Sequence, residues 1–241
     1  MKDLGRLWYF LGLELAQTER GILISQQKYT SDIIEVAALT DIKTTNTPLE
    51  FHSKLLPIDG TPLADLIRYR QLVDKLVYLC LTGPYIAHAV SIFSHFVSTP
   101  LFSHYNCSSS DSQISQRHHH SITTHVIHLF IRAYAYSDVD WANCLYTRRS
   151  TTGFYLFLGD SLISWQNKKH DVVSCSSCET EFGAITTTIR EIVHVMRLLA
   201  DFGVFLIAFT PLTCDNQSAV KIATVFCERT KHIKIDRYFT H

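Results

Sequence analysis

One amphipathic helix pattern in the second half of the chain constrains the fold more than any other feature. Between residues 182 and 199, apolar positions recur at alternating spacings of three and four, at Phe182, Ile185, Ile189, Ile192, Met196 and Leu199. Ser176 and Glu179 fit a capping box before this stripe, and Gly203 follows it at the position of a C′ residue. A helix with a single apolar stripe needs an apolar surface to pack against.

Strand patterns on both sides of this helix supply such a surface. Three apolar, β-capable runs precede the helix, and the second and third are joined at Gly159–Asp160 by a hairpin-type turn. A short strand and a second helix follow it. The segments are IRAYAYSD (131–138), TTGFYLFLGD (151–160), SLISWQNKK (161–169), PLTCD (211–215) and NQSAVKIATV (216–225). This order predicts an α/β sheet that begins with a meander.

The first third of the chain also has mixed α/β patterns. WYFLGLEL (8–15) and GILISQ (21–26) are apolar runs separated by a turn, which predicts a hairpin. Helices are expected over QQKYTSDIIEVAAL (26–39), RYRQLVDKLVYLCL (68–81) and AHAVSIFSHFV (87–97). Residues 103–125 are rich in Ser and His without a helical or strand period, which favours an irregular loop over a metal-binding His tract.

Charge and targeting signals limit the possible functions. The 241 residues carry no net charge, so nucleic-acid binding would depend on local patches. The pairs Arg148–Arg149 and Lys168–Lys169 are candidates, although such pairs also occur on ordinary solvated surfaces. Glu14 interrupts the N-terminal apolar stretch, so we expect no signal peptide and an intracellular location, cytoplasmic or nuclear. No apolar run reaches membrane-spanning length, and no membrane partner is expected.

A cysteine-based site is an alternative class. Cys175 and Cys178 form a CxxC motif, and a zinc or redox protein would use this pair together with the His-rich tract. No second pair at zinc spacing accompanies the motif, which disfavours this interpretation.

Three acidic residues stand where an α/β sheet gathers its functional groups. Asp138 follows the first strand of the second half, Asp215 follows the fourth, and Glu181 lies in the first turns of the long helix. Carboxylates gathered in this way suit Mg²⁺ or Mn²⁺, which promote phosphodiester hydrolysis. Each acid also has a structural alternative: Asp138 and Asp140 as turn formers, Glu181 as a helix-dipole charge, and Asp215 with Asn216 as a helix cap.

Several blocks that contain these acids resemble a known family. AYSDVDWANCLYTRRSTTGFYLFLGDSLISWQNKK, VVSCSSCETEFGAI and LTCDNQSAVKIA resemble the RNase H domain of copia-type LTR retrotransposon Pol polyproteins. Upstream, DLGRLWYFLGLEL, TPLADLIRYRQLVDKLVYL and AHAVSIFSHFV resemble the end of the reverse transcriptase and its connection to RNase H.

The resemblance implies a function and a set of residues. Asp138, Glu181 and Asp215 match catalytic carboxylates that hold Mg²⁺ or Mn²⁺ in a two-metal site. The implied activity is hydrolysis of the RNA strand of an RNA–DNA hybrid, which is the expected partner. No polymerase activity is expected, because the family's YVDD motif does not occur here. The expected nucleic-acid-binding residues are Arg148, Arg149, Lys168, Lys169, Asn216 and Gln217.

The predicted fold is α/β, an incomplete RNase H-like mixed sheet with flanking helices, preceded by a small α/β reverse-transcriptase connection region. The predicted parts are the end of reverse transcriptase and connection (1–105), an irregular linker (106–130) and an RNase H-like domain without its last strand and helix (131–241). A hypothesis for the linker is a frameshift, because codons for residues 108–117 can be chosen so that a one-nucleotide shift spells a family helix.

These departures from the family predict a loss of catalysis. The resemblance implies a fifth strand, a helix with a fourth catalytic aspartate and further Pol segments, which we expect this chain to lack, so we expect an impaired or inactive ribonuclease. The alternative function is an inactive retroelement remnant that binds nucleic acid weakly.

Overall fold

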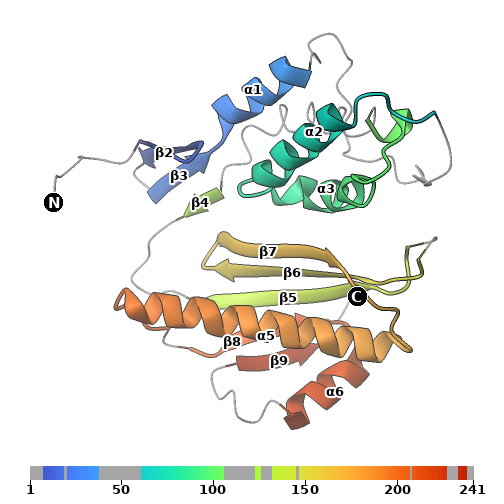
Figure 1. The fold of residues 1–241 in the computed structure, drawn as a ribbon. Helices are drawn as coiled ribbons and strands as arrows, with labels where there is room; N and C mark the ends of the chain where they lie inside the picture. Colours follow the sequence, from blue (N-terminus) through green and yellow to red (C-terminus); the bar gives the residue numbers. More distant parts are fainter. Residues whose placement is uncertain are drawn as a thin grey trace. The chain divides into compact units, whose positions relative to one another are not determined.

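The computed structural model describes residues 8–18, 21–37, 61–105, 123–125, 132–144, 147–206, 208–226 and 233–237. The chain divides into two compact units, Met1–Thr124 and His125–His241. Each unit has its own sheet and its own apolar core, so the predicted mixed α/β class is confirmed (Figure 1).

The first unit contains a four-stranded sheet in the order β1-β2-β3-β4. Its strands are β1 (Tyr9–Phe10), β2 (Leu13–Thr18), β3 (Gly21–Ser25) and β4 (Thr123–His125). β2 and β3 pair antiparallel from Glu14↔Ser25 to Thr18↔Gly21, which confirms the predicted hairpin. β4 lies in the stretch 106–130, for which the sequence predicts an irregular linker. The rest of that stretch, including the segment of the frameshift hypothesis and the His-rich tract, lies outside the described residues.

Three helices of the first unit confirm the periodic patterns of the sequence. They are α1 (Gln27–Ala37), α2 (Leu66–Leu79) and α3 (Ala87–Ser94), and a short 3-10 helix, η1 (Pro84–Ile86), precedes α3. The Asp65 side chain caps α2 by accepting a hydrogen bond from the backbone N–H of Arg68 at 3.0 Å. Apolar residues of these elements, among them Ile33, Leu76 and Ile86, form one buried cluster.

The second unit contains a five-stranded mixed sheet in the order β7-β6-β5-β8-β9. Its strands are β5 (Ala133–Asp140), β6 (Thr151–Leu158), β7 (Ser161–Lys169), β8 (Thr210–Cys214) and β9 (Ile233–Arg237). β5, β6 and β7 form the predicted antiparallel meander, and β8 pairs parallel to β5. Because β5 and β8 are parallel neighbours, their carboxyl ends lie at the same edge of the sheet.

Strand β9 corrects the prediction of a sheet without its last strand. It pairs parallel to β8 from Thr210↔Ile233 to Cys214↔Arg237, so the sheet has five strands and not four. Alternating β-branched residues, Ile233 and Ile235, favour a strand, and the pairing satisfies backbone groups along the edge of β8. The prediction rests on the family resemblance and not on this alternation, which is why it omits the strand.

The long helix α5 (Ser177–Asp201) forms where its stripe and its caps predict it. At its start, Ser176 Oγ accepts a hydrogen bond from the Glu179 N–H at 3.1 Å. At its end, Gly203 adopts a φ of +75°, and the Val204 N–H donates to the Leu199 carbonyl at 2.9 Å. This pattern is a Schellman motif, which explains why glycine follows the helix.

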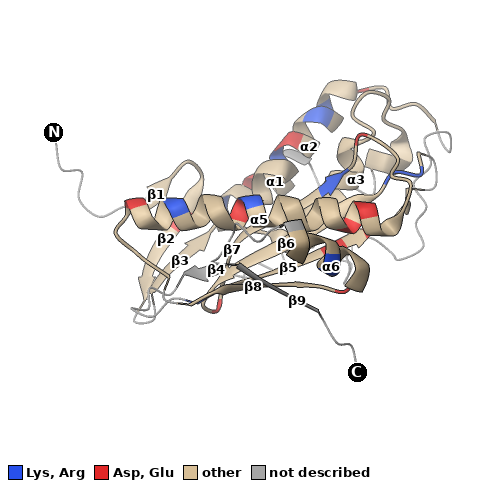
Figure 2. Cartoon of the chain, turned by 90° about the horizontal axis from the view of Figure 1, so that it is seen from below, with Lys and Arg blue, Asp and Glu red and all other residues tan. Residues whose placement is uncertain are grey.

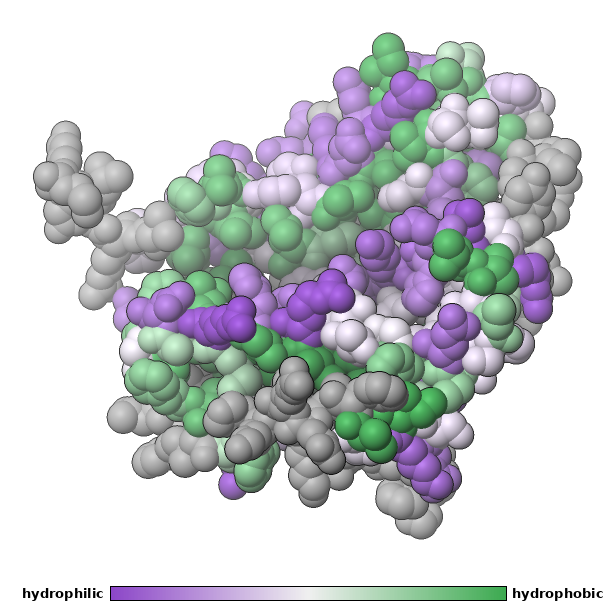
Figure 3. Space-filling model, turned by 60° about the horizontal axis from the view of Figure 1, so that its bottom comes forward, coloured by the Kyte–Doolittle hydropathy of each residue, from purple (hydrophilic) through white to green (hydrophobic). Residues whose placement is uncertain are grey.

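The outer face of α5 is polar, as expected for a helix that covers a sheet on one side. Acidic and basic residues recur along α5 in Figure 2. The space-filling view of Figure 3 shows hydrophilic side chains in a band along this helix. None of the helices that the structure describes combines the length and the apolar character needed to cross a bilayer.

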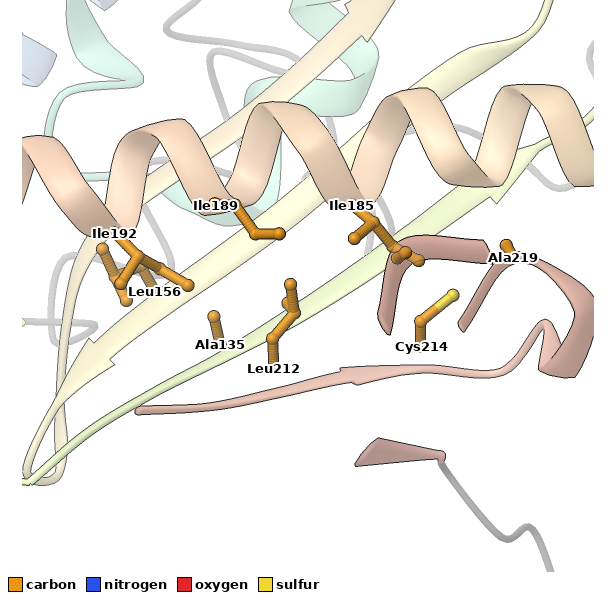
Figure 4. Close-up of a cluster of buried hydrophobic side chains, with 9 residues drawn as sticks. Ala135, Leu156, Ile185, Ile189, Ile192, Leu212, Cys214 and Ala219 are labelled. Atoms are coloured by element: carbon orange, nitrogen blue, oxygen red, sulfur yellow. The ribbon is translucent and has the colours of Figure 1, made fainter. Parts of the chain in front are cut away.

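The inner face of α5 builds the core of the second unit. Ile185, Ile189 and Ile192 point from the helix toward Ala135 of β5 and Leu212 of β8 (Figure 4). A second helix, α6 (Gln217–Phe226), packs its alanines into the same cluster. Both helices therefore cover one face of the sheet, and their packing holds the first turns of α5 against the carboxyl ends of β5 and β8.

Candidate metal centre

Glu181 lies on the inner side of the first turns of α5 and is nearly buried, with 6% of its side chain exposed. Neighbouring hydrogen bonds fix this end of the helix. Thr180 Oγ1 donates to the Ser176 carbonyl at 2.9 Å, and the Cys175 N–H donates to Glu179 Oε2 at 3.0 Å. Glu179, and not Glu181, is therefore the acid that serves the helix terminus, and the carboxylate of Glu181 is directed to the sheet.

Asp215 is the first residue after β8, and its side chain is exposed. The next residue, Asn216, accepts a hydrogen bond at Oδ1 from the Ala219 N–H at 3.0 Å and so caps α6. The predicted alternative of a helix cap formed by Asp215 with Asn216 is therefore confirmed for Asn216, and the cap leaves the role of Asp215 to be explained. The carboxylate of Asp215 has an oxygen close to the carboxylate of Glu181, so both acids could bind the same ligand.

Cys214 joins these two acids in one cluster. One ligand atom each from Glu181, Cys214 and Asp215 lies within 4.8 Å of the others. The Cys214 side chain is 1% exposed, and its Sγ donates a hydrogen bond to Glu181 Oε2 at 3.6 Å. Cys214 is not among the site residues predicted from the sequence. The signal that identifies it is its place as the last residue of β8, one position before Asp215, with the side-chain alternation that directs it to the helix face.

Asp138 is placed near this cluster but outside it. It lies in β5 and is exposed, whereas Ser137 and Val139 on either side of it are buried. The Asp140 carboxylate accepts a hydrogen bond from Asn143 Nδ2, so Asp140 serves the turn after β5 and Asp138 remains within the strand. Of the three predicted carboxylates, the structure brings Glu181 and Asp215 together and leaves Asp138 beside them.

The electrostatics of the cluster link all three acids. The pKa of Glu181 is raised to about 7, first by burial and then by the negative charges of Asp215 and Asp138. Hydrogen bonds from the Cys214 thiol and the Val139 backbone partly offset this rise. Burial raises the pKa of Cys214 to about 12, so its thiol stays protonated at neutral pH. A divalent cation would compensate the negative charges that crowd Glu181.

A buried hydroxyl adds to the polar groups at this edge. Ser137 is 4% exposed, and its Oγ has no hydrogen-bond partner among the residues that the structure describes. The parallel register pairs Ala135 with Leu212 and Tyr136 with Thr213, and Ser137 and Cys214 are the residues that follow this last pair. Both side chains belong to the buried set that alternates toward the helices.

The predicted basic residues lie at the same end of the sheet. β6 begins just after Arg148 and Arg149, and β7 ends with Lys168 and Lys169. The register pairs Thr151 with both Lys169 and Asp140, which places these residues next to the end of β5. Arg148 and Lys168 are exposed.

The other two basic residues are partly buried. Arg149 and Lys169 are intermediate in exposure, and Lys169 Nζ donates a hydrogen bond to Cys144 Sγ at 2.8 Å. Asn216 and Gln217 follow Asp215 in the chain, where Asn216 caps α6 and Gln217 is its first residue.

The CxxC motif does not assemble a site in the described residues. Cys178 packs against the apolar core, whereas Cys175 is exposed. Among the residues that the structure describes, the cluster of Glu181, Cys214 and Asp215 is the group of ligand atoms close enough to hold a metal ion.

Comparison with known proteins finds similar chains, although no family model matches. The chain is 32% identical over 250 residues to the retrovirus-related Pol polyprotein from transposon RE2 of Arabidopsis thaliana. This match covers 99% of the present chain and 17% of that polyprotein. It is 34% identical to the corresponding polyprotein from transposon RE1 of the same plant, over 99% of this chain and 16% of that protein. An uncharacterized mitochondrial protein of this plant is 36% identical over 80% of each chain. The chain thus spans only a small part of the transposon polyproteins.

Proposed function

Because the chain belongs to the family of retrovirus-related Pol polyproteins from copia-type transposons, we propose that its second unit is a metal-dependent ribonuclease acting on RNA–DNA hybrids. The observation that carries the proposal is the convergence of Glu181 and Asp215 at the carboxyl ends of α5-covered strands, with the charge of Asp138 acting on Glu181. Exposed basic residues at the same sheet edge supply charge for a phosphate backbone.

The donor set fits a divalent cation. Glu181 and Asp215 offer carboxylate oxygens, the ligands that Mg²⁺ and Mn²⁺ prefer, and their crowding raises the pKa of Glu181. When bound, such a cation supplies Lewis acidity and an activated water for phosphodiester hydrolysis. Glu181 and Asp215 would hold it, and Asp138 would add negative charge from the adjacent strand.

The residues of the chain have separate tasks in this proposal. Asp215, which is exposed, faces the solvent from which a substrate arrives, whereas Glu181 is anchored by the packing of α5. Arg148 and Lys168 are exposed at the neighbouring strand ends and position the phosphates of the hybrid. Specificity for the RNA strand would come from contacts to its 2′-hydroxyl groups.

A second candidate function is nucleic-acid binding without cleavage. One observation favours it: Asp138, the third predicted ligand, is not part of the close cluster of ligand atoms. A site held by two carboxylates alone gives a divalent cation fewer protein ligands than a site held by three. In this case the basic residues at the sheet edge would bind phosphates, and the acids would serve only the local electrostatics.

Cleavage of a strand-labelled RNA–DNA hybrid by the purified chain discriminates the two functions. The proposal expects cleavage of the RNA strand in Mg²⁺ or Mn²⁺, no cleavage in EDTA, and loss of cleavage in Asp215→Asn and Asp138→Asn. Glu179→Gln is the matched control, because Glu179 serves the cap of α5 and not the cluster. Hybrid binding by a folded protein that leaves the RNA intact in both metals would establish the second candidate instead.

A further inference from the structure

The cluster contains a donor that hard cations do not need. Cys214 Sγ lies within 4.8 Å of ligand atoms from Glu181 and Asp215, and its side chain is 1% exposed. Mg²⁺ is bound through oxygen, whereas Zn²⁺ and Cd²⁺ readily accept thiolate together with carboxylate. One sulfur and two carboxylates form a mixed donor set that suits a thiophilic divalent cation.

The hydroxyl of Ser137 is a further buried polar group at this end of β5. Ser137 is 4% exposed, and its Oγ is without a hydrogen-bond partner in the described part of the chain. It follows Tyr136, which pairs with Thr213, the residue before Cys214. A buried hydroxyl without a partner costs free energy, and an ion at Cys214, or a water bound to that ion, would provide one.

We propose that Glu181, Cys214 and Asp215 bind a thiophilic divalent cation such as Zn²⁺, and that this cation competes with Mg²⁺ for the two carboxylates. The Cys214 S–H bond breaks as the metal–sulfur bond forms, and its proton passes to the solvent, without any change of oxidation state. Binding would reduce the negative charge that crowds Glu181. The competition, but not the binding itself, rests on the proposed ribonuclease function.

Cadmium is the probe, because a cadmium–thiolate bond has an ultraviolet charge-transfer band that nitrogen and oxygen ligands do not produce. The fully reduced 241-residue chain is titrated with Cd²⁺ alone, and then with Zn²⁺ to displace it. The wild type is expected to develop the band at one equivalent and lose it on addition of Zn²⁺. Cys214→Ser is expected to lack this saturable band while retaining the circular dichroism of the wild type.

Two further variants keep the test decisive. Asp215 is exposed, so Asp215→Asn should fold without a burial cost. This variant is expected to weaken Cd²⁺ binding by more than about tenfold, because loss of a residue that only supports a metal ligand already lowers metal affinity by about that factor. The double variant Cys175→Ser, Cys178→Ser removes the CxxC and is expected to bind as the wild type. A band that persists unchanged in Cys214→Ser, or that is lost in the CxxC variant, overturns the proposal.

The hydrolysis assay separates this inference from the proposed function. In a chain that cleaves hybrid, Zn²⁺ is expected to inhibit Mg²⁺-dependent cleavage, with an inhibition constant that rises in Cys214→Ser relative to the wild type. A cadmium band without any cleavage would retain the cation site and refute the ribonuclease. Cleavage without a cadmium band and without zinc inhibition would retain the ribonuclease and refute the cation site.

Discussion

Cys214 donates a hydrogen bond from Sγ to Oε2 of Glu181 at 3.6 Å and so links the end of β8 to the start of α5. Both side chains are almost fully buried. The pKa of Cys214 is raised to about 12 and that of Glu181 to about 7, so the thiol holds its proton while Glu181 changes charge near neutral pH. A protonation equilibrium of the candidate metal centre is thereby coupled to the packing of the second unit.

Glu181 should make the stability of the fold depend on pH. Its pKa rises from 4.5 in the unfolded chain to about 7 in the folded protein, so folding favours the protonated acid. The stabilisation is complete below about pH 4.5 and is lost as the pH rises to about 7, with a span of about 3 kcal/mol. As the pH rises through this range, the unfolding free energy of Glu181→Gln, measured with denaturant, should therefore increase relative to that of the wild type. An equal pH dependence of the two proteins would contradict this coupling.

Asp215 should be the stronger of the two neighbouring charges that act on Glu181. Burial is the largest cause of the raised pKa, and the charge of Asp215 has a larger effect than that of Asp138. Asp215→Asn should thus lower the pKa of Glu181 more than Asp138→Asn does. Carbon-13 NMR titration of the Glu181 carboxyl measures both shifts, and the reverse order would show that Asp138 lies closer than the structure places it.

Substitution by alanine should have opposite effects on stability at Gly183, within α5, and at Gly203, just after its C-terminus. Gly183 lies within the helix, and a Cβ there meets no atom within 4 Å, so Gly183→Ala should stabilise the protein by about 0.5–1 kcal/mol. Gly203 has a φ of +75°, so Gly203→Ala should destabilise it by about 1 kcal/mol despite the same open space. Thermal unfolding of the two variants checks the signs, which should differ.

Ser176 should matter for stability, and its neighbour Ser177 should not. Ser176 Oγ caps α5 through the Glu179 N–H at 3.1 Å, so Ser176→Ala should cost about 1 kcal/mol of unfolding free energy. Ser177 is exposed and begins the helix, and Ser177→Ala should change stability by less than about 0.5 kcal/mol. Equal effects of the two substitutions in denaturant unfolding would argue against the cap.

The basic residues at the sheet edge should carry a salt-dependent part of hybrid binding. Arg148→Glu with Lys168→Glu should weaken binding and lower the slope of log affinity against log salt by about 1 for each phosphate that is no longer bound. Arg197→Glu is the matched control, since Arg197 is exposed on α5 sixteen residues beyond Glu181. Fluorescence anisotropy with a labelled hybrid at several salt concentrations measures these slopes. The same decrease of slope in the control would mean that the effect is one of net charge only.

Local patterns in the sequence determined much of the fold. The stripe from Phe182 to Leu199, the cap at Ser176 and the terminator Gly203 together specify α5, because each acts within a few residues. The β2–β3 hairpin and the β5–β6–β7 meander follow in the same way from alternation and short turns. The identities of Asp138, Glu181 and Asp215 as candidate ligands were also evident, because acids at the ends of apolar runs are visible in the chain itself.

Only the tertiary structure decided which of these groups meet. The packing of α5 against the sheet brings Glu181 within 4.8 Å of Cys214 and Asp215, although 33 positions separate Glu181 from Cys214 in the sequence. It also buried Glu181, left Asp138 outside the cluster and added β9 to the sheet. Strand partners and registers depend on contacts between distant segments, and the pKa of a carboxyl depends on the solvent and charges that those contacts leave around it. No local pattern contains either quantity.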